Sequence, residues 1–247
     1  MREWIIGRNP IYEVLQIRRR QAFRLLIAEG VGEKGRLAQI VQIASSLRLP
    51  IETVPRSQLD KIGQGHQGAA LEVSQFSYSN LEDILDLAST RKEPPLILIL
   101  DTLQDPQNMG TLLRTCDAVG AHGVVLPLRR TATITPAVVH ASSGASEHLL
   151  IAQANLAQAI SSLKEQGVWI VGLEGDPQAE NVQNVRLDGS LALVVGNEGE
   201  GMRRLVRESC DIVMRIPMRG KVASLNAAVA GSVALYLAWQ ARGYQGY

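Results

Sequence analysis

The chain has 247 residues, of which 46% are hydrophobic and 20% charged, and its formal net charge is +1. This composition excludes a collagen-like, disulfide-scaffolded or wholly disordered chain, and the length suits one large domain or two modest ones. Its two cysteines, Cys116 and Cys210, lack any Cys/His spacing typical of zinc, so we expect a reducing compartment and no metal. No signal-peptide core follows Met1, and the apolar stretch 225–239 is too short to span a bilayer. We therefore expect a cytoplasmic protein.

The first 77 residues predict a small α/β domain. Asn9 and Pro10 are typical of a helix cap and a first helical position, and apolar spacing predicts a helix over 34–47. Strand-like apolar runs occupy 4–6, 23–28, 51–54 and 69–73. Residues 1–75 hold 11 Lys or Arg against 7 Asp or Glu, whereas the rest of the chain holds 14 against 17.

This basic region offers candidate RNA contacts. Arg18 and Arg19 belong to a run of arginines that can contact phosphates, although a solvated helix end explains the run equally well. The glycine-rich loop 63–68 combines a flexible backbone with polar side chains that suit RNA. From this loop we select Gln67 and His66, and the alternative for His66 is an ordinary loop histidine.

Residues 78–95 predict a linker, because an acidic amphipathic stretch is followed there by paired prolines. From residue 96 to 247 we expect an α/β domain with a mainly parallel sheet, since apolar runs typical of buried strands alternate with helical segments. The predicted strands are 96–100, 124–126, 169–171, 191–195 and 212–216. Ligands of such sheets bind beyond the carboxyl ends of the strands, which directs attention to the loops after Leu100, Leu173, Val195 and Ile216.

The loop after Leu100 leads into a predicted helix that carries Asn108, Gly110 and Arg114. Asn108 can cap that helix, Gly110 permits a close approach, and Arg114 lies on nearly the same helical face as Gly110. A phosphate or ribose at the helix start would meet both. The alternative is a capped helix whose Arg114 pairs with a surface acid.

The loop after Val195 has the pattern Gly-x-x-Gly-x-Gly and carries Glu198 and Glu200. A dinucleotide site needs Gly-x-Gly-x-x-Gly, and two carboxylates would repel a pyrophosphate. A cationic ligand such as a sulfonium is electrostatically more favourable. After Ile216, Ser224 predicts an N-cap, whereas an amide at Asn226 in the first turn needs a partner that capping does not supply.

At these loops the sequence resembles the SpoU (TrmH) family of RNA ribose 2′-O-methyltransferases. Three motifs stand in the family's order: Asn108-x-Gly-x-x-x-Arg114, Val195-Gly-Asn-Glu-Gly, and Ile216-Pro-Met followed by Ser224-Leu-Asn226. The likeness continues through Thr135-Pro-Ala-Val-Val-His and covers roughly residues 96–242. Gly7-Arg8-Asn-Pro and Gly65-His-Gln-Gly are similar to the small RNA-binding domain of the large-subunit rRNA guanosine 2′-O-methyltransferases (RlmB type), which adds Arg8 to the expected RNA contacts.

The resemblance implies a homodimer, a catalytic domain with a trefoil (SPOUT-type) knot, and S-adenosylmethionine as the cofactor. The implied cofactor contacts are Leu173, Glu174, Gly196, Asn197, Ile216, Met218, Ser224 and Leu225. Asn197 departs from the family, whose members often have serine there, and we expect this change to alter little.

The implied catalytic residues are Asn108, Arg114, Glu198, Ser224 and Asn226. A guanidinium with a pKa above about 12 is a poor proton acceptor, so Arg114 is expected to stabilise a developing alkoxide or clamp RNA phosphate, with general-base action as the alternative. Glu198, Ser224 and Asn226 would then orient the ribose, Arg114 or the cofactor. Asn108 would hold the motif loop.

The predicted function is thus methyl transfer from S-adenosylmethionine to a ribose 2′-hydroxyl of RNA, with a guanosine of large-subunit rRNA as the expected target. A tRNA ribose methyltransferase is the main alternative. Two other classes are a non-catalytic RNA-binding ribosome-assembly protein, which predicts damaged motifs, and a nucleotide-dependent dehydrogenase, which the order of glycines in the 196–202 loop disfavours.

Overall fold

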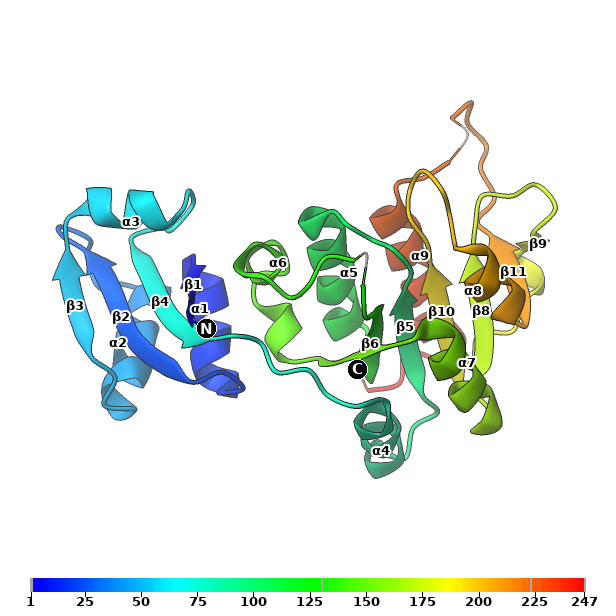
Figure 1. The fold of residues 1–247 in the computed structure, drawn as a ribbon, viewed down its shortest axis with the longest axis horizontal. Coiled ribbons are helices and arrows are strands. Elements are labelled where there is room, and N and C mark those ends of the chain that lie inside the picture. Colours follow the sequence, from blue (N-terminus) through cyan, green and yellow to red (C-terminus); the bar gives the residue numbers. More distant parts are fainter. Residues whose placement is uncertain (1, 130, 223, 247) are drawn as a thin grey trace. The chain divides into compact units, whose positions relative to one another are not determined.

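The computed structural model describes residues 2–129, 131–222 and 224–246, and the chain forms two compact units (Figure 1). The N-terminal unit comprises residues 1–77 together with 133–148, and the C-terminal unit comprises 78–132 together with 149–247. The segment 133–148 therefore belongs by its contacts to the N-terminal unit, although it lies in the second half of the chain.

The N-terminal unit has a four-stranded sheet in the order β1-β4-β2-β3, in which β4 pairs antiparallel with β1 and β2, and β3 pairs parallel with β2. Its elements are β1 (Arg2–Ile6), α1 (Arg8–Ile17), β2 (Ala22–Ala28), α2 (Arg36–Ser46), β3 (Ile51–Val54), α3 (Arg56–Ile62), β4 (Ala69–Ser74), α6 (Pro136–Ala141) and η1 (Ala145–Glu147). The predicted strands are confirmed. The predicted cap at Asn9 is wrong, because α1 begins at Arg8 after Gly7, whose φ of 90° suits glycine.

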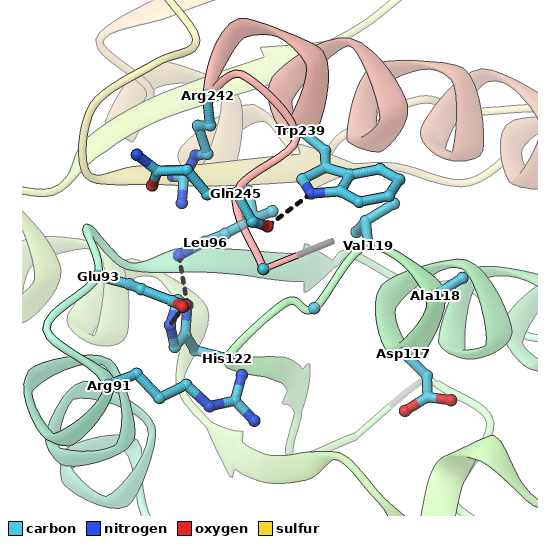
Figure 2. A pocket seen from close by; sticks show the side chains of 12 residues that line it. Arg91, Glu93, Leu96, Asp117, Ala118, Val119, His122, Trp239, Arg242 and Gln245 are labelled. Atoms are coloured by element: carbon cyan, nitrogen blue, oxygen red, sulfur yellow. Dashed lines mark hydrogen bonds and ion pairs between the residues drawn. The ribbon is translucent and has the colours of Figure 1, made fainter.

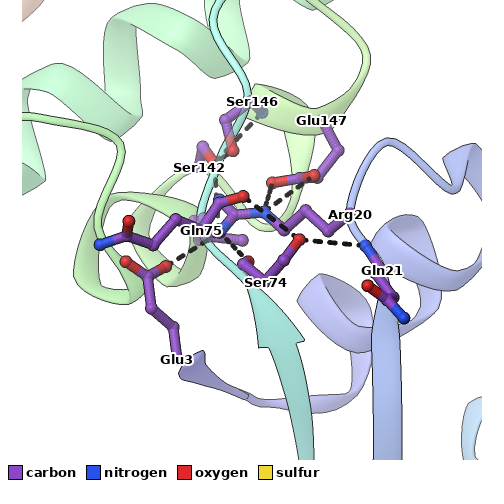
Figure 3. A network of polar contacts seen from close by, with 9 residues as sticks. Glu3, Arg20, Gln21, Ser74, Gln75, Ser142, Ser146 and Glu147 are labelled. Carbon is purple, nitrogen blue, oxygen red and sulfur yellow. Dashed lines mark hydrogen bonds and ion pairs between the residues drawn. The ribbon is translucent and has the colours of Figure 1, made fainter. Parts of the chain in front are cut away.

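A buried ion cluster ties segment 133–148 to the rest of the N-terminal unit (Figure 3). The Arg20 side chain has no solvent exposure, and its Nε donates to the Glu147 carboxylate at 3.1 Å. The Nη1 of Arg20 donates to the Glu3 carboxylate at 3.0 Å and to the Ser74 carbonyl at 3.4 Å. Burial raises the pKa of Glu147, and the positive charge of Arg20 opposes that rise. Charges buried this deeply are kept only where they are paired.

The C-terminal unit has a seven-stranded sheet in the order β7-β6-β5-β10-β8-β11-β9. Its strands are β5 (Leu96–Leu100), β6 (Gly123–Pro127), β7 (Leu150–Ala154), β8 (Trp169–Leu173), β9 (Glu180–Asn181), β10 (Leu191–Val195) and β11 (Ile212–Arg215). Every adjacent pair is parallel, which confirms the predicted sheet. Strand β10 lies between β5 and β8, both of which precede it in the chain. The trefoil knot stays a prediction.

Helices cover both faces of this sheet. They are α4 (Leu81–Arg91), α5 (Pro106–Ala118), α7 (Leu156–Glu165), α8 (Arg204–Ser209) and α9 (Ala227–Ala241), with a short 3₁₀ turn η2 (Val182–Asn184). Helices α4, α7 and α8 bury apolar residues against one face, and α5 packs with α9, which contacts β10. A Cβ at Gly231 of α9 would lie 2.6 Å from Leu112 of α5, so glycine permits this close packing.

The segment predicted as a linker, 78–95, contains helix α4. A capping box between Asn80 and Asp83 starts the helix, and Ile84 is fully buried in the core of the C-terminal unit. The acidic residues of the stretch are therefore the exposed face of a packed helix. Along the described ranges, no helix is long and apolar enough to cross a membrane.

Candidate active site

A cavity of about 440 Å³ opens at the carboxyl ends of β8, β10 and β11, where helix α9 begins. All eight expected cofactor contacts line it: Leu173, Glu174, Gly196, Asn197, Ile216, Met218, Ser224 and Leu225. Asp176, Glu198 and Glu200 add carboxylates to the same wall. The cavity therefore combines an apolar side with a negatively charged side.

The loop that follows β10 forms a tight turn on this wall. Asn197 and Gly201 exchange two backbone hydrogen bonds, at 3.1 and 3.0 Å, and the Asn197 side chain accepts from the Gly199 N–H at 2.9 Å. A Cβ at Gly196 would lie 2.3 Å from the backbone of Gly201. Gly196 is thus required by the loop's own turn, and not by the approach of a phosphate as in a dinucleotide site.

Three polar side chains from separate segments meet beside the cavity. The Asn108 Nδ2 donates to Glu198 Oε1 at 2.7 Å. The Asn226 Nδ2 donates to Asn108 Oδ1 at 3.1 Å and also to Glu198 Oε1. We call these three residues the amide–carboxylate cluster. A single carboxylate oxygen therefore accepts from two amides, which fixes the orientation of all three side chains.

Two helix caps differ from those predicted. Asn226 caps α9, its Oδ1 accepting from the N–H groups of Ala228 and Val229 at 2.9 and 3.1 Å, so the predicted cap at Ser224 is wrong. Asp105 caps α5, so the predicted cap at Asn108 is wrong as well. Because Asp105 does the capping, the Asn108 side chain is available to bind Glu198.

Arg114 is not brought into the amide–carboxylate cluster. It is exposed on α5, does not line the cavity, and has no hydrogen bond or ion pair with any other described residue. Its neighbour Thr115 contacts α9 through a 2.8 Å hydroxyl pair with Ser232. The alternative in which Arg114 pairs with an acid of its own chain therefore finds no support in the described ranges.

Three residues that sequence reasoning missed, Asp101, Arg203 and Arg207, help to hold the cavity loop in place. Asp101, at the end of β5, binds Arg203, and the Thr102 carbonyl accepts from the Asn197 side chain at 3.3 Å. Glu174 accepts from the Met202 N–H at 3.2 Å and from Arg207 at 2.8 Å. Asp101 directly follows a buried strand, which is the signal that could have singled it out.

In the N-terminal unit, two of the expected RNA contacts come together. The Arg8 backbone N–H donates to Gln67 Oε1 at 3.0 Å, and Arg8 Nε donates to the Gln67 carbonyl at 3.1 Å. With Arg56 they line a hollow of about 360 Å³. His66 is only 3% exposed: Nδ1 accepts from the Gly68 N–H, and Nε2 binds Asp60. We therefore correct the assignment of His66, which holds its loop from inside.

The arginine run is not one continuous basic surface. Arg20 is buried against Glu147, and Arg24 donates to Glu72 at 2.8 Å. Arg19 lies over the Phe76 ring at 5.2 Å, and burial lowers its pKa. Arg18 is exposed in a left-handed conformation at the end of α1. Only Arg18 thus presents a largely free cation.

A second cavity, of about 340 Å³, lies at the amino ends of β5 and β6 (Figure 2). His122 uses both ring nitrogens there, Nδ1 accepting from the Leu96 N–H and Nε2 binding Glu93 at 3.1 Å. Arg242 donates to the carbonyls of Pro94, Pro95 and Gly189 at 2.6–2.8 Å. Burial lowers the pKa of His122. These polar groups bind the protein itself, which makes this cavity a poor candidate for chemistry.

No group of three or more His, Cys, Asp or Glu side chains gathers as a metal site anywhere in ranges 2–129, 131–222 and 224–246.

Residues 95–236 match the SpoU rRNA methylase family. The chain belongs to this family. As a SpoU methylase it is an RNA methyltransferase, and its methyl donor is S-adenosylmethionine. The dehydrogenase alternative is thereby excluded.

Residues 4–79 of this SpoU methylase match a second family, the RNA 2′-O ribose methyltransferase substrate-binding domain. The chain is 41% identical over 242 residues to YacO of Bacillus subtilis (strain 168), which is named as a TrmH-family tRNA/rRNA methyltransferase, covering 97% of this chain and 96% of that protein. A protein of the same description from Staphylococcus aureus is 40% identical, with 96% of each chain covered.

Solved structures share the fold of this SpoU methylase. AviRb from Streptomyces viridochromogenes, crystallised with AdoMet, superposes with a TM-score of 0.81 at 22% identity, covering 98% of this chain and 91% of AviRb. An RNA 2′-O ribose methyltransferase gives a TM-score of 0.77 at 25% identity, covering 98% and 89%. The predicted α/β fold class is confirmed.

Proposed function

We propose that this enzyme methylates the 2′-hydroxyl of a ribose in large-subunit rRNA, with guanosine as the target nucleoside. The observation that carries the proposal is the amide–carboxylate cluster of Asn108, Glu198 and Asn226 beside a cavity lined by the family's cofactor motif. In this proposal residues 96–247 hold the catalytic site, residues 1–77 bind RNA through Arg8 and Gln67, and the enzyme is cytoplasmic.

The cavity fits S-adenosylmethionine by its chemistry. Leu173, Ile216, Met218 and Leu225 supply apolar lining for an adenosyl group, and the carboxylates of the same lining attract a cationic sulfonium. When bound, the cofactor supplies an electrophilic methyl group. The chain's own residues must position the ribose oxygen in line with that methyl, while the proton of the hydroxyl group passes to solvent water.

In this mechanism Glu198 orients the two amides, and the remaining hydrogen-bonding capacity of the cluster holds the ribose. Each carboxylate oxygen has about two acceptor sites, so Glu198 keeps capacity beyond the two amide N–H groups that it accepts. Ser224 also lines the cavity. Arg114 stabilises the developing alkoxide electrostatically, because a guanidinium offers hydrogen-bond donors and no acceptor.

Arg114 neither lines the cavity nor contacts the amide–carboxylate cluster of its own chain, so we propose that it serves the site of a second copy in a homodimer. Helix α9 presents Val229, Val233 and Tyr236 to solvent with 47, 37 and 47% exposure, an apolar stripe suited to a second copy. Arg114 lies next to Thr115, which contacts α9 at Ser232. A copy that covers the stripe would therefore lie close to Arg114.

Ribose-methylation mapping of total RNA from cells with and without the protein tests the substrate. Loss of one 2′-O-methyl guanosine in large-subunit rRNA is expected, and restoration by the wild-type gene but not by Glu198→Gln ties the loss to the site. A loss confined to tRNA would replace rRNA by tRNA as the substrate. No change in either RNA would overturn the proposal.

Mixing two variants of strongly reduced activity tests whether Arg114 acts in the second copy. In a heterodimer of Arg114→Ala and Glu198→Gln, one site regains both residues if Arg114 acts across the dimer, and neither site does if it acts within one chain. After refolding together, random pairing should restore roughly a quarter of wild-type activity, because half of the dimers are mixed and half of their sites are complete. Mixtures that stay inactive would place Arg114 in its own chain.

A further inference from the structure

The segment 101–108 contacts the cavity loop 197–203 at three successive points. Asp101 binds Arg203, the Thr102 carbonyl accepts from Asn197, and Asn108 donates to Glu198. The first two contacts hold the two ends of the loop, and the third joins Glu198, which lies between those ends. The position of Glu198 therefore depends on how the loop ends are attached to this segment.

Asp101 makes the strongest of these attachments. Its carboxylate has no solvent exposure and accepts from the Arg203 backbone N–H and from Arg203 Nε, both at 2.7 Å, while Nη2 of the same guanidinium lies 2.6 Å from Asp101 Oδ1. Asp101 thus fixes both the backbone and the side chain of the residue that ends the loop. Its own N–H donates to the Val195 carbonyl at 2.8 Å, which joins it to the strand from which the loop leaves.

Stability alone is a weak explanation for this arrangement. The Asp101 carboxylate is fully buried, and the water that it loses offsets much of its attraction to Arg203, whose side chain stays 42% exposed. Thr102 also holds a left-handed φ of 60°, which is uncommon for a residue other than glycine, and it directs its carbonyl toward Asn197. Buried charge and an uncommon backbone conformation are thus both placed where the loop is attached.

We propose that Asp101 is a positioning residue for the methyl transfer, which fixes the 197–203 loop so that Glu198 meets Asn108 and Asn226. The inference rests on the proposed catalytic role of Glu198. Asp101 itself does not line the cavity. Removing its charge leaves the cavity lining intact but frees the loop, and a displacement of about 1 Å at a reacting group can lower the rate about 100-fold.

A double-mutant cycle between Asp101 and Glu198 separates positioning from general stability. Asp101→Asn should lower kcat for methyl transfer by about 10- to 100-fold when the assay is run well below the melting temperature of the variant. The Kd for RNA should stay unchanged within about twofold. In the Glu198→Gln background the same change should cost nothing further. Arg203→Lys, which keeps the charge but loses the planar fork, should have an intermediate effect. Glu208→Gln, in the exposed Arg204–Glu208 pair of the neighbouring helix, is the matched control and should have no effect.

Hydrogen–deuterium exchange of the enzyme without ligands gives a second readout. Asp101→Asn should accelerate exchange at the amides of Gly201, Met202 and Arg203 but leave those of β10 protected, and Glu208→Gln should change neither. Losses in kcat that multiply in the double variant, or unchanged loop exchange, would overturn the inference. If wild-type enzyme methylated no RNA, the proposed function would fail, whereas the exchange experiment would still decide whether Asp101 fixes the loop.

Discussion

One cavity lies at the amino ends of the strands in the seven-stranded sheet, which we call the amino edge, and another lies at their carboxyl ends, the carboxyl edge. The two cavities use their polar groups differently. At the amino edge, Arg242 and His122 bind backbone groups and Glu93, so these polar side chains connect the segments that line the cavity. At the carboxyl edge, half-buried Asn108 and exposed Glu198 and Asn226 bind one another. Fixing exposed side chains costs conformational entropy with little gain in burial. The hydrogen-bond partners of its polar groups, more than its volume, therefore distinguish a functional cavity from one that is only a gap in the packing.

The largest effect is expected from Asn226→Asp at the carboxyl edge. Aspartate caps a helix as well as asparagine, so the free energy of unfolding should change by less than about 0.5 kcal/mol. Its second carboxylate oxygen would replace the donor to Glu198 and bring two negative charges together, which should lower kcat between about 100- and 1000-fold. Methyl transfer to RNA from labelled S-adenosylmethionine and thermal unfolding measure the two effects. Near-normal turnover would reduce Asn226 to a helix cap.

Much of the fold could be predicted from local pattern. Continuous apolar runs marked β5, β6, β8, β10 and β11, because parallel strands covered on both faces are apolar throughout. Strands β7 and β9 were both missed, and β9 is only two residues long, too short to show any periodicity. The placement of 133–148 in the N-terminal unit also escaped prediction. It depends on the pairing of Arg20 with Glu147, residues 127 positions apart in the chain.

The candidate site was predictable in its members but not in its contacts. The rule that ligands bind at the carboxyl edge, together with the family motifs, selected Glu198 and Asn226. Whether Asn108 or Asn226 caps its helix depends on where that helix begins, to within one or two residues. Helix ends are the least certain feature of sequence-based prediction. Asp101 was not selected, because its partner Arg203 lies 102 residues away and no local pattern connects them.

At the amino edge, Arg242→Ala should affect stability instead of catalysis. It removes three charge-assisted hydrogen bonds to carbonyls and leaves those groups partly buried, so we expect a loss of about 2 kcal/mol in the free energy of unfolding. Urea titration measures this loss, and kcat measured in the folded range should stay within about twofold of wild type. A kcat that fell as far as in Asn226→Asp would remove the distinction between the two edges.

His122 should make the amino edge sensitive to acid. Burial lowers its pKa in the folded protein, and Glu93 partly offsets that shift, while Arg91 and Arg242 reinforce it. Below about pH 6.5 the unfolded chain therefore takes up more protons than the folded protein, and stability falls as the pH falls. His122→Asn keeps an acceptor for the Leu96 N–H but does not titrate. Urea titrations between pH 7 and 5 should show a shallower decline for this variant, and parallel curves would contradict the assignment.

The smallest effect is expected from a cap on the carboxyl edge but outside the cavity. Asn155 caps α7 with a single hydrogen bond of 3.3 Å from the Gln158 N–H, and it contacts none of the amide–carboxylate cluster. Asn155→Ala should lower the free energy of unfolding by about 1 kcal/mol and leave kcat unchanged. Thermal unfolding and the methyl-transfer assay, run beside Asn226→Asp, measure both quantities. If Asn155→Ala also lowered kcat, the loss of kcat in Asn226→Asp would follow from its place at the carboxyl edge alone. The contact between Asn226 and Glu198 would then not be needed to explain that loss.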